Sequence, residues 1–204
     1  FDSGGIRIHY TDEGRGTPLL LVHGFANPSG SWQWRRTGRI AALAKTYRVI
    51  ALDNRGHGRS EKPHDPSQYG MEMVEDLVRL LDHLNIPKAH IVGYSMGGFI
   101  VLKMVVTHPD RIISAAACAA GWERSTPESR AFAESVAKAL ERGDATPLAA
   151  RLGIEKGPLT IKEKLAMKAY FSYFNDSRAL AAAARGSVEM HLTEQELKTN
   201  QVPT

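Results

Sequence analysis

The segment HIVGYSMGGFIVL, residues 90–102, constrains the fold more than any other part of the chain. An apolar run meets a glycine, a single serine and two further glycines, and then becomes apolar again. Ser95 lies between Gly93 and Gly97 in a match to G-x-S-x-G, which places a serine on a tight turn from a strand into a helix. Side chains two residues before and after the serine would collide in that turn, so both positions require glycine. The segment therefore predicts a strand–turn–helix unit that lifts the Ser95 hydroxyl above the edge of a sheet.

Strand and helix signals alternate along residues 1–121. Continuous apolar runs are typical of strands that are buried on both faces, as parallel strands are. Such runs occupy residues 19–22, 47–52, 89–94 and 111–120, and helical patterns lie between them over 31–45, 73–84 and 96–109. The alternation predicts an α/β fold with a mostly parallel sheet and helices on both faces.

The pattern changes after Gly121. Residues 122–200 carry helix signals and almost no strand signal. The expected capping boxes pair Ser125 with Glu128, Thr160 with Glu163, and Thr193 with Glu196. This stretch therefore predicts a helical insertion within the strand–helix alternation, and residues 201–204 predict the start of a further strand.

Two backbone N–H groups are expected to face the serine. HGF at 23–25 follows the first buried run, and Gly24 lets the chain turn back so that the N–H of Phe25 points toward the site. The N–H of Met96 lies at the start of a helix, where developing negative charge is favoured.

LLLVHGF, VIALDNRGHGRS and HIVGYSMGG together resemble the α/β-hydrolase family in their order and rough spacing. The resemblance implies that Ser95 is the nucleophile and that Phe25 and Met96 supply the oxyanion hole. It also implies that residues 1–121 are the N-terminal part of the hydrolase core. Residues 122–200 correspond to the family's helical cap or lid, which selects the substrate, and 201–204 to the start of the next core strand. Trp32 and Tyr94 are candidates for lining the pocket.

The family orders its triad as serine, acid and histidine. Because its acid follows the strand after the cap and its histidine follows the last strand, both are expected after Thr204. The chain as given is therefore expected to be incomplete as an enzyme, lacking the C-terminal strands and exposing a sheet edge that favours self-association.

Residues within the chain are weaker substitutes for the missing partners. His23 and His57 lie on loops near the rim of the site, and bracing of the oxyanion loop is the favoured interpretation of both. Asp53 is likewise expected to brace a loop. His108 is interpreted as a helix-end residue, and His191 as ordinary cap surface more than as a base.

Serine at the elbow favours ester hydrolysis through an acyl-enzyme on small to medium acyl substrates. The family's epoxide hydrolases and haloalkane dehalogenases carry aspartate there. Enol-lactone hydrolysis, carbon–carbon bond hydrolysis and perhydrolysis remain alternatives on the same site. A non-catalytic ligand-binding protein, or an inactive fragment, is the alternative of a different class.

Composition argues against several classes of partner, and the resemblance implies a small-molecule ester-type substrate. The net charge is +4 without a long basic block, so nucleic acid is not expected. Cys118 is the single cysteine, the histidines are dispersed, and no phosphate or dinucleotide motif occurs, so neither metal nor cofactor is expected. The given chain has no leader-like start and no bilayer-length apolar run, which predicts a cytoplasmic protein that does not bind membranes.

Overall fold

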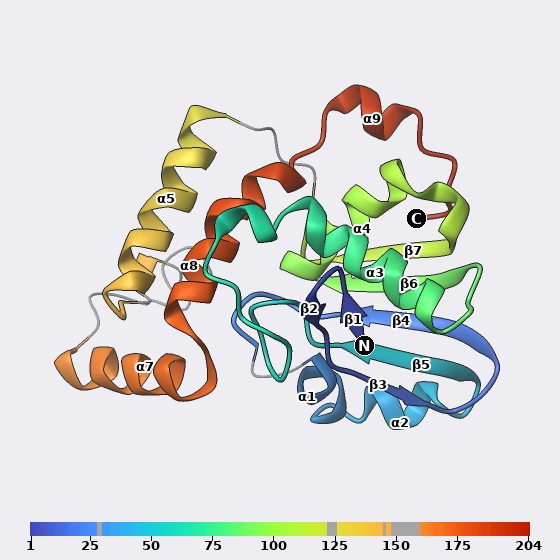
Figure 1. Ribbon diagram of the computed structural model, residues 1–204, viewed down its shortest axis with the longest axis horizontal. Coiled ribbons are helices and arrows are strands. Elements are labelled where there is room, and N and C mark those ends of the chain that lie inside the picture. Colours follow the sequence, from blue (N-terminus) through green and yellow to red (C-terminus); the bar gives the residue numbers. More distant parts are fainter. Residues whose placement is uncertain (28–29, 122–125, 145, 148–159) are drawn as a thin grey trace.

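The computed structural model describes residues 1–204 except 28–29, 122–125, 145 and 148–159 (Figure 1). Its centre is a sheet with the strand order β3-β5-β4-β6-β7, five strands among the described residues. The strands of the molecule are β1 (Asp2–Ser3), β2 (Ile6–Arg7), β3 (Tyr10–Glu13), β4 (Thr17–Val22), β5 (Tyr47–Leu52), β6 (Ala89–Tyr94) and β7 (Ile112–Cys118). β3 runs antiparallel to β5, and the other pairs in this sheet are parallel. The expected α/β fold with a mostly parallel sheet is confirmed.

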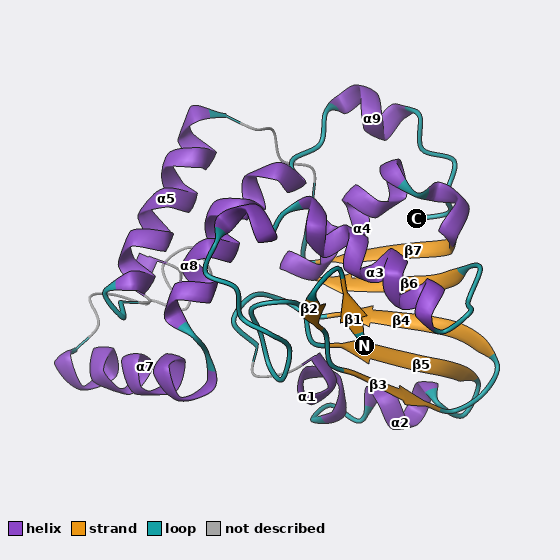
Figure 2. Cartoon of the chain, viewed as in Figure 1, coloured by secondary structure: helices purple, strands orange, loops and turns teal. Residues whose placement is uncertain are grey.

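Helices cover both faces of the sheet, and Figure 2 shows them around the strands. The helices are α1 (Gly30–Arg35), α2 (Arg39–Leu43), α3 (Met71–His83), α4 (Met96–Thr107), α5 (Pro127–Glu141), α7 (Ile161–Phe174), α8 (Ser177–Gly186) and α9 (Glu194–Lys198), with 3-10 turns η1 (Pro66–Gln68), η2 (Pro109–Arg111) and η3 (Ser187–Met190). No helix in the described part of the chain is long and apolar enough to cross a membrane.

Alternate residues of the central strands feed two separate cores. Leu20 packs with α3 and α4 on one face, whereas Leu21 packs with Trp34 and Ile40 on the other. This follows from the period of two along a strand, because a parallel strand between two helical layers must be apolar on both sides.

Two predicted elements differ in the structure. The single helix expected over 31–45 is two short helices, because Gly38 adopts φ +70 and separates α1 from α2. The last apolar run, expected to be buried on both faces, is the edge strand β7, in which Ile113 is 38% exposed. An edge strand has a neighbour on one side only, so apolar composition alone does not bury it.

The chain end lies along the outer edge of β7. The N–H of Ala115 donates to the carbonyl of Pro203 at 2.8 Å, and Val202 is buried in the main core. Residues 201–204 are not assigned as a strand. Self-association through this edge stays a prediction.

Helices α5 and α8 pack against each other, beyond the carboxyl ends of the parallel strands (Figure 1). The capping boxes expected at Thr160 and Thr193 are present. The first box begins one residue later than predicted, at Thr126 with Ser129, because Pro127 occupies the first turn of α5. Ser125 lies outside the described residues.

A buried ion pair ties the N-terminal hairpin and the loop after β5 to α3. Arg55 donates from Nε and Nη2 to the two carboxylate oxygens of Asp76 at 2.7 and 2.8 Å, and the Ser3 hydroxyl donates to the same carboxylate at 2.5 Å. Arg55 and Asp76 are both almost fully buried. Removing one partner would leave the other charge buried without compensation.

We therefore expect Asp76→Ala to lower the free energy of unfolding by about 3–5 kcal/mol, measured by urea denaturation of the chain. Asp82→Ala is the matched control, because Asp82 is an exposed carboxylate on the same helix that pairs with Arg111 at 2.7 Å. Its loss is expected to cost at most about 1 kcal/mol. Equal losses in the two variants would contradict this account of the pair.

Candidate active site

Ser95 occupies a strained turn between β6 and α4. Its backbone has φ +52 and ψ −118, which serine rarely adopts, and it is the N-cap of α4. The N–H of Ser95 donates to the carbonyl of Cys118 at 2.8 Å, and its carbonyl accepts from the N–H of Gly98 at 2.8 Å. Both backbone groups of the strained residue are therefore held by neighbours.

The two glycines around Ser95 are required by close backbone approach. A Cβ on Gly97 would overlap the carbonyl oxygen of Val22 at the end of β4, and one on Gly93 would overlap the carbonyl of Gly97. Unlike the end of a side chain, a backbone oxygen within a sheet or helix cannot move aside. The steric argument made from the sequence therefore matches the contacts in the fold.

The loop after β4 holds one peptide plane in a fixed orientation. The carbonyl of Gly24 accepts from Nδ1 of His23 at 2.7 Å and from the side-chain amide of Asn27 at 3.1 Å. A trans peptide is planar, so fixing the Gly24 carbonyl also fixes the direction of the Phe25 N–H on the opposite side. The N–H groups of Phe25 and Met96 donate to no other described residue, which leaves both available to an oxyanion.

His23 is a structural brace. Its Nε2 accepts the N–H of Asn54 at 2.9 Å, so the hydrogen lies on Nδ1 and is donated to Gly24. Burial lowers the pKa of His23 to about 4, despite the bond to the Gly24 carbonyl. With both ring nitrogens engaged, this imidazole has no free position for a proton from Ser95.

His57 and Asp53 also lie beneath the site, fully buried. Nδ1 of His57 donates to the carbonyl of Arg55 at 3.0 Å, and burial, followed by the neighbouring His23, lowers the pKa of His57 to about 3. The Asp53 carboxylate accepts the backbone N–H groups of Gly30 at 2.5 Å and Arg59 at 2.9 Å. Both residues hold loops, in agreement with the bracing interpretation from the sequence.

The other candidate histidines occupy different places. His108 is the C-cap of α4, at the opposite end of the helix from Ser95, and lies 3.6 Å from the carboxylate of Glu75. His191, interpreted from the sequence as cap surface, instead lines the same cavity as Ser95. The difference arises because η3, which directly precedes His191, contacts α4, and no local pattern reveals a contact between segments so far apart in the sequence.

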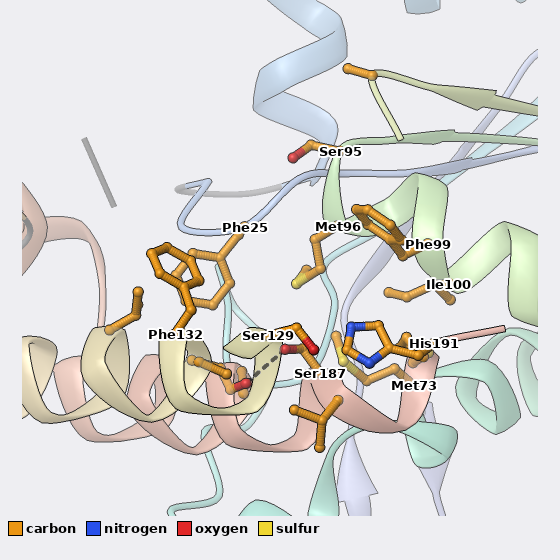
Figure 3. Close-up of a pocket in the computed structure, with 17 residues that line it drawn as sticks. Phe25, Met73, Ser95, Met96, Phe99, Ile100, Ser129, Phe132, Ser187 and His191 are labelled. Atoms are coloured by element: carbon orange, nitrogen blue, oxygen red, sulfur yellow. Dashed lines mark hydrogen bonds between the residues drawn. The ribbon is translucent and has the colours of Figure 1, made fainter. Parts of the chain in front are cut away.

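Ser95 opens into a cavity of about 370 Å³. Figure 3 shows Ser95 at one end, with Phe25 and Phe132 on one wall and Met96, Phe99 and Ile100 on the other. α5, α8 and η3, all within the range expected to form a cap, supply much of the lining. The lining is mostly apolar, which suits the hydrocarbon part of a small molecule.

Of the two residues suggested as pocket lining, the structure tests only Tyr94. Tyr94 is 43% exposed and is not among the described lining residues. Tyr94 is the last residue of β6, and its ring lies beside Gly24 instead. The side chain of Trp32 lies outside the described part of the structure.

Several residues that shape the site were missed from the sequence. Phe132 and Val136 enter the cavity from α5, and Met190 enters it beside His191. A helix that packs on a cavity has the same apolar period as one that packs on a core, so periodicity did not distinguish them. Within the described residues, no cluster of side chains is suited to hold a metal ion.

Comparisons with known proteins agree on one fold. A family model described as alpha/beta hydrolase fold matches residues 17–154. The 2-hydroxymuconate semialdehyde hydrolase of Pseudomonas sp. strain CF600 is 42% identical over 110 residues, covering 53% of this chain and 38% of that protein. The bifunctional epoxide hydrolase 2 of Rattus norvegicus is 37% identical over 110 residues, covering 53% of this chain and 19% of its own. The chain thus spans less than half the length of either relative.

Solved structures match across the whole chain. A thermophilic esterase from Thermogutta terrifontis has a TM-score of 0.78 at 27% identity, covering 100% of this chain and 75% of its own. Est816, described as an N-acyl homoserine lactone degrading enzyme, has a TM-score of 0.70 at 29% identity, and the match covers 100% of this chain and 78% of Est816.

We expect Gly97→Ala to lower the free energy of unfolding by about 1–3 kcal/mol, because the new methyl group would overlap a backbone oxygen of β4. Gly121→Ala is the matched control, since no described atom lies within 4 Å of a Cβ built there. Urea denaturation of both variants tests the expectation. A Gly97→Ala chain as stable as the control would show that the turn relaxes easily.

The lowered pKa values of the two buried imidazoles predict that the free energy of unfolding decreases in acid. In the unfolded chain both histidines bind a proton below about pH 6.5. In the fold their lower pKa values keep His23 neutral down to about pH 4 and His57 neutral down to about pH 3. Unfolding therefore takes up protons, and stability falls as the pH drops from 6.5 toward 4, by up to about 1.4 kcal/mol per pH unit for each histidine.

His57→Phe should flatten this pH slope, measured by urea unfolding at a series of pH values. Tyr69→Phe is the control, because it removes a buried hydrogen bond to the Pro63 carbonyl without removing a group that titrates in this range. The control is expected to lower stability equally at every pH. An unchanged slope in His57→Phe would contradict the assignment.

Proposed function

Since the chain belongs to the α/β-hydrolase fold family, we propose that Ser95 is the nucleophile of a serine hydrolase that acts on carboxylic esters with small to medium acyl groups. The observation that carries the proposal is the position of Ser95, on a strained elbow that opens into a mostly apolar cavity. The N–H groups of Phe25 and Met96 have no other described acceptor and lie beside this cavity.

The chemistry follows from these groups. The Ser95 oxygen attacks the ester carbonyl, a general base takes the hydroxyl proton, and the carbonyl oxygen becomes an anion that accepts the N–H groups of Phe25 and Met96. The carbon–oxygen bond to the alcohol then breaks, and the alcohol leaves with the proton. Water attacks the acyl-enzyme by the same route, releasing the acid and regenerating Ser95.

The general base and its acid are proposed to come from residues after Thr204. His23 has both ring nitrogens engaged, His57 is buried against the Arg55 carbonyl, and His108 lies at the far end of α4. No hydrogen bond joins the Ser95 hydroxyl to a side chain in the described part of the chain. The edge of β7, with Pro203 beside Ala115, is where a following strand would carry these residues toward the site.

A serine favours acyl transfer over epoxide opening. Attack of a hydroxyl on a carbonyl carbon gives an ester, which water cleaves readily. Attack on an epoxide carbon would give an ether, which water does not cleave under the same conditions. The likeness to epoxide hydrolases therefore supports a shared fold more than a shared reaction.

We assign α5, α8 and η3 to a cap that selects the acyl group, because they line the cavity away from Ser95. Arg185 of α8 donates from Nε to Glu134 of α5 at 2.8 Å, so the two helices form one unit. Asp176, the N-cap of α8, accepts a bond from His64 of the core at 2.9 Å. These contacts hold the unit against the core near the cavity.

Hydrolysis of a carbon–carbon bond next to a carbonyl is the second candidate. It is favoured by the 42% identity to a 2-hydroxymuconate semialdehyde hydrolase, which extends over 110 residues. The same elbow and N–H pair serve both reactions, so the difference lies in the substrate that the cavity accepts.

In the whole gene product that contains this chain, Ser95→Ala is expected to lower turnover of short p-nitrophenyl esters by at least about 10³-fold. It should also abolish labelling by a fluorophosphonate. The isolated 204-residue chain should be a poor esterase, because a serine hydroxyl without a base is a weak nucleophile.

Ser129→Ala is the matched control. Ser129 lines the same cavity, but its hydroxyl donates to the Thr126 carbonyl at 3.0 Å within the cap of α5, so turnover and labelling should persist. Turnover that survives Ser95→Ala would exclude the proposed nucleophile. A whole gene product that binds acyl ligands without any turnover would favour the non-catalytic alternative.

A further inference from the structure

One imidazole lines the otherwise weakly polar wall of the cavity. The polar side chains among the described lining residues are Ser95, Ser129, Ser187 and His191. The hydroxyls of Ser129 and Ser187 donate to carbonyls of their own helical segments, at 3.0 and 2.7 Å. Apart from Ser95, His191 is therefore the polar residue of the described lining whose side-chain polar atoms are not already engaged.

The imidazole of His191 lacks an internal partner. Nδ1 is buried without a hydrogen-bond partner, and no bond joins either ring nitrogen to another described residue. A buried polar atom without a partner costs free energy, and in a cavity a bound molecule can remove that cost. The position of this ring is therefore suited to a ligand.

The backbone holds His191 firmly in place. Met190 and Leu192 on either side are 4% and 5% exposed, so both are anchored in the interior. The carbonyl of His191 accepts from Nζ of Lys103 in α4 at 3.4 Å, and the same ammonium lies 3.3 Å from Glu196 of α9. The ring is presented from an anchored segment, as a recognition group needs to be.

Figure 3 shows Met96 and Phe99 between Ser95 and His191. The imidazole of His191 thus lies further along the cavity, and not directly beside the Ser95 hydroxyl. A substrate whose carbonyl carbon is at Ser95 would reach His191 with the far part of its acyl group.

We propose that His191 donates a hydrogen bond to an oxygen at the far end of the acyl group, so that the preferred substrates are esters of oxo-substituted acids. An imidazole carries at least one N–H in each protonation state, so an oxygen acceptor always finds a donor. The inference rests on the proposed function, because it places the ester at Ser95. The apolar wall between the two residues holds the intervening methylene groups.

The test compares p-nitrophenyl esters of oxo acids, levulinate and its longer homologues, with straight-chain esters of equal length. Using the whole gene product, kcat/KM is expected to favour the best oxo ester by roughly five- to tenfold, the effect of one hydrogen bond. His191→Phe should remove this preference, so that the ratio of kcat/KM between oxo esters and plain esters of equal length falls to about one. His191→Gln, which keeps an N–H donor, should retain most of it, and Ser187→Ala should not change it.

Calorimetric binding of the free acids to Ser95→Ala separates this inference from the proposed function. Ser95-dependent turnover with no oxo preference at any chain length, or with a preference that survives His191→Phe, overturns the role of His191 alone. A binding preference that requires His191 in a protein without Ser95-dependent turnover overturns the hydrolase proposal alone and supports the oxygen site. If neither Ser95-dependent turnover nor a His191-dependent oxo preference is found, both the hydrolase proposal and the role of His191 are overturned.

Discussion

The contact between α4 and the end of β4 is the constraint on which the rest of the site depends. Gly97 approaches the carbonyl of Val22 so closely that no side chain fits, and this approach fixes where the helix begins. The chain must then turn within one residue, which forces Ser95 into its positive φ and directs its hydroxyl out of the sheet. The strain is local, whereas the backbone bonds from Ser95 to Cys118 and Gly98 that hold it come from the surrounding fold.

The loops around this elbow have little regular structure, and buried polar side chains hold them instead. His23 bridges the loops after β4 and β5 as a neutral imidazole, with one nitrogen accepting and the other donating. Asp53 does the same with a carboxylate that accepts backbone N–H groups. Because these groups are used to hold the backbone, His23 and Asp53 orient the core side of the site and are not free to act as a base. His57 holds the Arg55 carbonyl through Nδ1, and its buried Nε2 has no hydrogen-bond partner among the described residues.

The cavity divides recognition between two parts of the molecule. The core contributes the elbow, the loop that carries Phe25 and the apolar face of α4, all fixed by the sheet. The helices after β7 contribute the opposite wall, which is apolar except for the satisfied serines of α5 and η3 and for His191. Under the two proposals made above, the substrate has its reacting carbonyl at Ser95, a hydrocarbon middle and an oxygen acceptor at His191. The reaction type would follow from the core, and the choice of acyl group from the helices.

The sequence by itself determined the turn at Ser95, strands β4, β5 and β6, and two of the three helix caps, because these features follow from local interactions. Each of these depends on residues within a few positions of one another, where steric exclusion and hydrogen bonding act without tertiary context. The break at Gly38 and the exposure of β7 were missed, because a glycine within a helical pattern is tolerated and edge position depends on neighbours. Only the tertiary structure decided that His191 lines the cavity and that Tyr94 does not, because both depend on segments brought together from distant parts of the chain. A histidine looks the same in sequence whether it braces a loop, caps a helix or faces a ligand, since its role is set by which groups surround its two nitrogens.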